Sequence, residues 1–376
     1  MQSNGSRRGH QRSILATWMR SGTSKGLFIL RDQLPERQSV WKPIILAIMG
    51  TGDQTDGIGG GTPTTSKVAV ISRSTKPGFD VDYTFVQVDF VNSKLDMSGT
   101  CGNLAAGVGY FALDQRLVDN PPGQKQVDVK VFVENTGQAL LVTIPIPQND
   151  AMCDVRVTFV TPNGGVTGRL FPSGSRKDYL SFNCPSTGVH HVVESTLIDS
   201  ANPFVLVDSA SMPGHYALHG PDDEQSRAIV EAIRRAGSVR MGLARDLTDA
   251  AQCQGTPKIV VVAPSSAAAP SADVQVTAFS VGVLHPALQA TAGICLAAAL
   301  SISGTVPSSL LASSTACSGT CPHGGTQPPR MWRIAHRAGL MDTEIIVSWD
   351  GEGEYLVEKG SITRTVRKLF EGRTFY

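Results

Sequence analysis

The chain has 376 residues, of which 41% are hydrophobic and 17% charged, a balance typical of a globular protein with a large core. The formal net charge of +1 gives no electrostatic reason to expect a nucleic acid or a membrane surface as a partner. No apolar run reaches the ~20 residues that span a bilayer, and the best candidate, residues 290–303, predicts a buried helix instead.

The N-terminal residues 1–13 carry three arginines and a histidine but no acid. Mitochondrial transit peptides have this composition, but the segment is short, so we expect a disordered tail. Seven cysteines without paired spacing, and the absence of a signal peptide, predict reduced thiols inside the cell. The expected location is therefore cytoplasmic rather than mitochondrial.

The first half of the chain predicts short strands and two helices. The expected strands are 14–19, 26–30, 68–72, 81–91, 127–133 and 139–144, the last two forming a hairpin. The expected helices are 43–49 and 104–113. The glycine-rich loop at 57–67 lacks the Gly-Lys-Ser/Thr order of a phosphate-binding loop, and it is not a dinucleotide-binding fingerprint either.

The second half repeats this order of elements. The expected strands are 204–207, 258–263 and 274–279, and the expected helices are 224–236 and 294–300. In both halves a polar turn between strands is followed by further strands and then by a small-residue loop that enters an apolar helix. This weak repeat predicts two similar α+β domains with a ligand in the cleft between them. We expect the domains to span 14–184 and 185–376.

The cysteines offer one candidate for chemistry and one for metal binding. Cys101 lies in a small-residue loop where an apolar helix begins, so the helix dipole and unpaired backbone N–H groups are expected to favour its thiolate. The same N–H groups can hold a carboxylate. The alternative is a small buried hydrophobic residue. Cys317, Cys321 and His323 lie close together but lack a fourth ligand with recognisable spacing, so we expect no metal site.

Three motifs carry a resemblance to a known family, namely 18–26 (WMRSGTSKG), 59–68 (GGGTPTTSKV) and 98–104 (SGTCGNL). Together they resemble the PrpF family, and segments at 199–203, 240–243, 256–258, 285–287 and 364–369 extend the resemblance over nearly the whole chain. The family includes 2-methylaconitate cis–trans isomerase, methylitaconate Δ-isomerase, 4-oxalomesaconate tautomerase and fungal aconitate Δ-isomerase.

The resemblance implies a diaminopimelate-epimerase-like fold. Each of two pseudo-symmetric domains would be a β-barrel-like sheet around a central helix, with the active site in the cleft between the domains. The two helices would begin at 101–103 and near 291–293, with their N-termini directed into this cleft. The last strand is a candidate to return to the first domain.

The resemblance also implies which residues form the site. Lys67 and Cys101 would transfer protons, and which of them removes the proton stays open. Lysine acts as a base only when burial or a nearby cation lowers its pKa, and the alternative for Lys67 is a surface lysine at a strand start. The expected substrate-binding residues lie in polar turns and at helix starts: Arg20, Ser21, Thr23, Ser24, Ser66, Gly102, Asn103, His285, Thr291 and Gly293.

Simpler structural roles are the alternatives for several of these residues. Residues 20–24 have the composition of a hairpin turn, Gly102 and Asn103 could cap a helix, and His285 could be a structural histidine. Ser21 departs from the family pattern, where a second glycine is common, and this puts the substrate in doubt. Epimerases of this fold carry a second cysteine near 291–292, where this chain has threonine and alanine, so racemisation by two cysteines is disfavoured.

The expected function is therefore that of a cofactor-independent isomerase of an aconitate-like unsaturated di- or tricarboxylate. An allylic proton would be removed and returned, which moves or rotates the C=C bond, with cis-aconitate to trans-aconitate as the preferred reaction. The alternatives are 2-methylaconitate, methylitaconate or oxalomesaconate isomerisation, or a role in secondary metabolism. A non-enzymatic partner of an aconitase-like enzyme is a further alternative, which the intact Lys67 and Cys101 disfavour. Homo-oligomerisation is left open.

Overall fold

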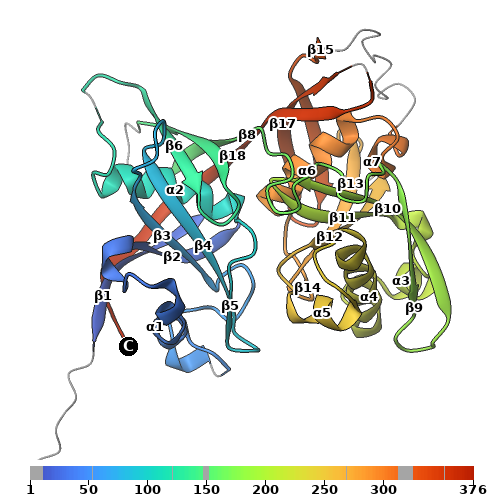
Figure 1. Ribbon diagram of the computed structural model, residues 1–376, viewed down its shortest axis with the longest axis horizontal. Helices are drawn as coiled ribbons and strands as arrows, with labels where there is room; N and C mark the ends of the chain where they lie inside the picture. The colour runs from blue at the N-terminus through green and yellow to red at the C-terminus, as the bar shows by residue number, and fades with distance from the viewer. Residues whose placement is uncertain are drawn as a thin grey trace, which may run out of the picture.

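The computed structural model describes residues 12–52, 54–120, 122–146, 152–267, 269–311, 325–350 and 352–376. They form two lobes that lie side by side, with β8 and β18 running between them (Figure 1). The expected N-terminal tail falls outside the described residues except at its last two positions, and so do Cys317, Cys321 and His323. In the part of the chain that is described, no helix is both long and apolar enough to cross a membrane.

The first lobe is a closed barrel around the helix α2 (Gly102–Asp114). Its strands follow one another in the order β1–β2–β3–β4–β6–β7–β8–β18 and return to β1. They are β1 (Ser13–Ser21), β2 (Ser24–Leu30), β3 (Lys67–Arg73), β4 (Val81–Asp89), β6 (Gln126–Val133), β7 (Gln138–Pro145), β8 (Cys153–Val160) and β18 (Tyr355–Phe375). α2 is apolar on nearly all sides because strands surround it.

The second lobe wraps its strands around α6 (Ala290–Ser301), every residue of which is buried. The strands are β9 (Asp178–Asn183), β10 (His190–Ser200), β11 (Asn202–Asp208), β12 (Lys258–Pro264), β13 (Val274–Ser280), β16 (Arg330–His336), β17 (Gly339–Trp349) and the start of β18. The succession of antiparallel, parallel, antiparallel and parallel pairing from β10 to β16 repeats that from β1 to β6. The repeat in the sequence thus corresponds to repeated connectivity.

The remaining elements lie at the rims and on the outside of the lobes. They are α1 (Trp41–Met49), β5 (Lys94–Asp96), α3 (Gly214–His219), α4 (Glu224–Arg240), α5 (Leu247–Gln252), β14 (Val283–Leu284), α7 (Val306–Ser309) and β15 (Gly325–Thr326), with short 3-10 turns at Arg31–Gln33, Gln38–Val40, Gln54–Asp56 and Ser209–Ser211. α4 begins where the Asp223 carboxylate accepts a hydrogen bond from the Ser226 N–H. Its apolar stripe then packs against the second lobe.

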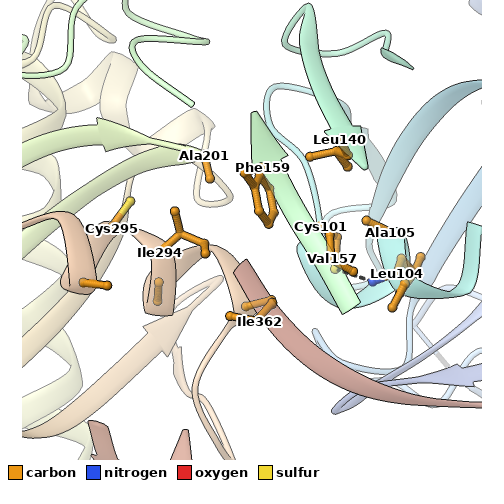
Figure 2. Packing of buried hydrophobic residues seen from close by; sticks show 14 of the residues in the cluster. Cys101, Leu104, Ala105, Leu140, Val157, Phe159, Ala201, Ile294, Cys295 and Ile362 are labelled. Carbon is orange, nitrogen blue, oxygen red and sulfur yellow. Dashed lines mark hydrogen bonds between the residues drawn. The ribbon is translucent and has the colours of Figure 1, made fainter. Parts of the chain in front are cut away.

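β18 takes part in both lobes. Its first part pairs with β17, its middle pairs with β8 from Lys359 to Val366, and its last part pairs with β1. Phe159 of β8 and Ile362 of β18 lie between the two central helices (Figure 2). Both helices consequently belong to one continuous hydrophobic core. The expected domain border at 184/185 falls between β9 and β10, and the division itself stays a prediction.

At Gly102, the start of α2 lies close to the start of α6. A Cβ atom at Gly102 would lie 2.9 Å from the Phe159 ring and 3.0 Å from the Ala290 Cβ. Because neither neighbour is the flexible end of a long side chain, we predict that Gly102→Ala lowers the free energy of unfolding by about 1–3 kcal/mol. Denaturant or thermal melting measures this change.

Gly214 provides the matched control. It is also the first residue of a helix, α3, and a Cβ there would meet no heavy atom within 4 Å. Gly214→Ala should change the unfolding free energy by less than about 0.5 kcal/mol. Equal stability of the two variants would contradict the tight contact between the two helix starts.

Candidate active site

The N-terminal ends of α2 and α6 meet at one pocket between the lobes. The first lobe contributes Cys101, Gly102 and Asn103, and the second contributes Ala290 and Thr291. Backbone N–H groups in the first turn of a helix lack partners within the helix and carry partial positive charge. The pocket is therefore suited to carboxylate groups at two opposite ends.

Lys67 lines this pocket as the first residue of β3 and is 8% exposed. Its Nζ donates a hydrogen bond of 2.6 Å to Oε1 of Gln87 and lies 5.0 Å from the centre of the Phe85 ring. Burial lowers the pKa of Lys67, while negative charge on Cys101 or Asp96 acts in the opposite direction. A buried lysine whose nearest acceptor is a neutral amide can lose its proton more readily than one in an ion pair.

Gln87 lies opposite Lys67 in the β3–β4 ladder, and its side-chain orientation is fixed by the backbone. Its Nε2 donates to the carbonyl oxygen of Ser66 at 2.9 Å, which leaves Oε1 to accept from Lys67. The Ser66 side chain is itself buried and does not line the pocket, and its Oγ has no hydrogen-bond partner within the described residues. The expected role of Ser66 in substrate binding thus lacks a direct route to the pocket.

Cys101 is the residue immediately before α2, and its Sγ accepts the N–H of Leu104 at 3.5 Å, which caps the helix (Figure 2). Cys101 is 9% exposed and lines the pocket together with Lys67. Negative charge on Cys101 favours the ammonium form of Lys67 and raises its pKa, so the two side chains influence each other at the pocket. A thiol and an amine, both able to carry or release a proton, are therefore neighbours at one helix start.

The predicted residues of the β1–β2 turn divide into two groups. Ser24 lines the pocket, and its buried Oγ lacks a hydrogen-bond partner among the described residues. Thr23 does not line the pocket itself, and its Oγ1 accepts a hydrogen bond of 3.0 Å from Nδ2 of the lining residue Asn103. Ser21 lies outside the pocket lining, because its Oγ donates to the carbonyl of Asn103 and accepts the N–H of Gly107. Ser21 therefore links β1 of the barrel to the backbone of α2 by two hydrogen bonds.

Arg20 also lies outside the pocket lining. Its guanidinium donates to the hydroxyl of Thr365 and to the sulfur of Met152. The guanidinium next to the start of α2 belongs to Arg364 of β18, whose Nε donates to Asn103 Oδ1 at 3.0 Å. Burial lowers the pKa of Arg364 to about 10. The fold thus places Arg364, from near the end of the chain, beside Asn103 at the start of α2, whereas the motif at 18–26 had indicated Arg20.

The second lobe supplies His285 and Thr291, and both line the pocket. The Nδ1 of His285 accepts the N–H of Ala287 at 3.1 Å, so a neutral ring carries its proton on Nε2. Burial lowers the pKa of His285 to about 4, so the ring is uncharged near neutral pH. Gly293 lies outside the lining and packs against Met341, where a Cβ would be 2.6 Å from the Met341 sulfur.

Cys295 lies one turn into α6, away from the pocket lining. Its thiol donates to the backbone carbonyls of Ser200 and Asn202, and burial raises its pKa. A thiol held in this way is poorly suited to proton transfer. The structure thus offers no second pocket cysteine at α6, within the residues it describes, to act with Cys101.

Two charged residues of the pocket were missed by the motif-based expectation. Asp96 of β5 and Lys258 of β12 both line it, and Asp96 accepts hydrogen bonds from the N–H and Oγ of Ser98. Burial lowers the pKa of Lys258, and the positive charge of Lys67 acts in the same direction. The repeat contained a signal for Lys258, because it begins the strand that corresponds to β3. Within the described ranges, no cluster of residues suited to a metal ion is present.

Contacts between the lobes close the pocket on one side. The side chain of Asn202, in the β10–β11 turn, accepts the N–H of Thr100 at 3.1 Å and donates to its carbonyl at 2.8 Å. The hydroxyls of Ser98 and Thr256 are hydrogen-bonded at 3.1 Å. The loop before α2 is therefore held by the second lobe, so the position of Cys101 depends on both halves of the chain.

Comparison with known proteins places this geometry in a family. The sequence model described as "PrpF protein" matches residues 11–376. The 2-methyl-aconitate isomerase of Shewanella oneidensis is 32% identical over 402 aligned positions, which cover 96% of each chain. The (4E)-oxalomesaconate Delta-isomerase of a Novosphingobium species is 33% identical over 381 positions, which cover 95% of this chain and 96% of the relative.

Solved structures agree with the observed fold. The crystal structure of a methylitaconate-delta-isomerase superposes with a TM-score of 0.70 at 28% identity, covering 98% of this chain and 96% of the other. A hydroxyproline epimerase from Agrobacterium vitis superposes with a TM-score of 0.56 at 11% identity, covering 97% and 93% of the two chains, which bears on the fold alone. The expected epimerase-like fold is confirmed, and the chain belongs to the PrpF family and is an isomerase.

Proposed function

We propose that the protein isomerises an aconitate-like unsaturated di- or tricarboxylate by allylic proton transfer, with cis-aconitate to trans-aconitate as the preferred reaction. The observation that carries the proposal is the convergence of Lys67, Lys258 and Cys101 on one pocket between two helix N-termini. Neither lysine has a carboxylate within ion-pair distance among the described residues. A partly buried ammonium at Lys258 without a counter-ion favours an anionic ligand, and a polycarboxylate also suits both helix ends.

In the proposed reaction, neutral Lys67 removes a proton from the methylene group of the substrate. The electron pair of the broken C–H bond spreads through the C=C bond into the attached carboxylate. The Cys101 thiol then donates its proton to the other end of the allylic system, and the C=C bond forms at its new position. Because Cys101 and Lys67 line the same pocket, the ammonium proton can return to the thiolate and restore both groups.

The carboxylates of the substrate would be held by the two helix starts and by neutral donors. Ser24 Oγ is buried and unpartnered in the described part of the chain, and His285 carries its proton on Nε2. The relatives named for 2-methyl-aconitate and 3-methylitaconate act on acids of the same general shape. These related acids are therefore the first alternatives if cis-aconitate is not turned over.

Proton NMR of the protein with cis-aconitate in D₂O, without added cofactor, tests the proposal. We expect trans-aconitate to appear, with deuterium entering the methylene position. If neither new signals nor exchange appear, cis-aconitate is not the substrate, and the same experiment then applies to 2-methylaconitate, 3-methylitaconate and oxalomesaconate. Failure with all four acids would overturn the proposed function.

Lys67→Ala should abolish both turnover and deuterium exchange, because the variant lacks the base that opens the reaction. We expect kcat to fall by about 10²–10⁴-fold. NMR in D₂O measures both quantities, and melting checks that the fold is retained. Lys25→Ala is the matched control, because Lys25 is exposed on the neighbouring strand β2. Exchange at the wild-type rate in Lys67→Ala would contradict the role of Lys67.

Cys101→Ala separates the two proton transfers. The variant keeps Lys67, so exchange of the methylene proton should continue while isomerisation falls by about 10²–10⁴-fold. NMR in D₂O measures both rates in one sample. Loss of exchange together with isomerisation would instead assign the first proton transfer to Cys101.

Gln87→Glu should move the activity profile toward higher pH. Lys67 must be uncharged to accept a proton, so activity rises with pH through its pKa. A carboxylate in place of the Gln87 amide favours the ammonium form and raises that pKa, which shifts the acidic limb of kcat/KM upward by about one pH unit or more. Gln87→Met, which is neutral and of similar length, should not shift the limb upward. If the acidic limb of Gln87→Glu does not move, the group that titrates in this limb is not Lys67.

A further inference from the structure

Lys258 occupies in the second lobe the place that Lys67 occupies in the first. Each lysine is the first residue of a strand, β12 or β3, that runs parallel to the strand before it. The next residues also correspond, since Ile259 pairs with Phe279 of β13 as Val68 pairs with Val86 of β4. The repeated fold therefore places two lysines at one pocket, which both of them line.

The positive charge of the Lys258 ammonium group is not neutralised by an acidic side chain in direct contact, within the described residues. Its Nζ donates to the carbonyl oxygen of Gly255 at 3.0 Å and lies 5.9 Å from the centre of the Phe204 ring. No carboxylate of the described residues forms an ion pair with it, and Asp96 acts on it only as a more distant charge. A cation withdrawn from water without an ion pair is costly unless a ligand supplies negative charge.

Lys258 and Lys67 differ in their hydrogen bonding, and this difference separates their roles. The Lys67 Nζ is held by the side chain of Gln87 and neighbours the Cys101 thiol, so it has a partner for proton exchange. Lys258 is held by a backbone carbonyl, which accepts hydrogen bonds but takes up no proton. An anion bound beside Lys258 favours its ammonium form, so this second lysine is suited to bind an anion.

We propose that Lys258 is a further catalytic residue whose ammonium group binds the carboxylate conjugated to the C=C bond of the substrate. This inference rests on the proposed function. When the allylic proton leaves, negative charge grows on that carboxylate, and a fixed cation stabilises the dienolate more than the ground state. Lys258 transfers no proton itself. It makes the allylic proton acidic enough for Lys67 to remove.

The test compares Lys258→Met, which removes the charge, with Lys258→Arg, which keeps it. Lys359→Met is the control, because Lys359 is exposed on β18 and lies outside the pocket lining. With cis-aconitate, we expect Lys258→Met to lower kcat/KM by about 100-fold or more, through a higher KM as well as a lower kcat. Lys258→Arg should recover at least about tenfold of this loss, and Lys359→Met should resemble wild type.

Binding of tricarballylate, a saturated tricarboxylate, provides a readout that does not require turnover. Calorimetry should show binding that weakens by about 10- to 100-fold in Lys258→Met and is unchanged in Lys359→Met. If tricarballylate binds through Lys258 but no unsaturated acid reacts, the proposed function fails while the anion site at Lys258 stands.

Two results would overturn the inference about Lys258. The first is a Lys258→Met variant whose kcat/KM and tricarballylate affinity stay within about threefold of wild type. The second is the loss of deuterium exchange in both Lys258 variants with unchanged tricarballylate affinity, which would make Lys258 a proton-transfer residue. Melting of each variant excludes unfolding as the cause of either result.

Discussion

The antiparallel crossing of β8 and β18 between the lobes is the constraint on which the site depends. It joins the middle of β18 to the first barrel while the start of β18 still pairs with β17 of the second lobe. Phe159, carried by β8, packs where the Cβ of Gly102 would otherwise be. Because packed interiors leave little room for adjustment, this crossing fixes how the starts of α2 and α6 meet, and with them the pocket.

The charge pattern of the pocket follows from this arrangement. Two strands that begin at corresponding points of the repeat each bring a lysine toward the same helix ends, and Asp96 is a nearby acid that pairs with neither. Gln87 holds Lys67 with a neutral oxygen, so the lysine is oriented without an ion pair that would keep it protonated. The ammonium of Lys258, which has no ion-pair partner among the described residues, contributes to the affinity for an anion when one binds.

Local pattern was sufficient for part of the fold and part of the site. The small-residue run before an apolar helix indicated Cys101, and the glycine and threonine loop before an apolar strand drew attention to Lys67, whose role came from the family resemblance. Arg20 and Ser21 were expected in the pocket because they share its polar turn, but Arg20 bonds to Thr365 and Ser21 bonds to the backbone of α2 instead. Arg364 comes from the far end of the chain, and no local motif at the pocket specifies it.

The sequence by itself determined the repeated α+β plan and the two buried helices, because periodicity, small residues and turn formers act over short stretches. Its family motifs indicated Lys67 and Cys101 as site residues. The strands β8, β9, β10, β16 and β17 were not predicted, and the last strand, β18, was expected only from the resemblance, since strand identity depends on pairing. Only the tertiary structure decided that Lys258 meets Lys67 and that Ser21 braces α2. Convergence of this kind depends on how the two lobes pack, and residue spacing does not encode that packing.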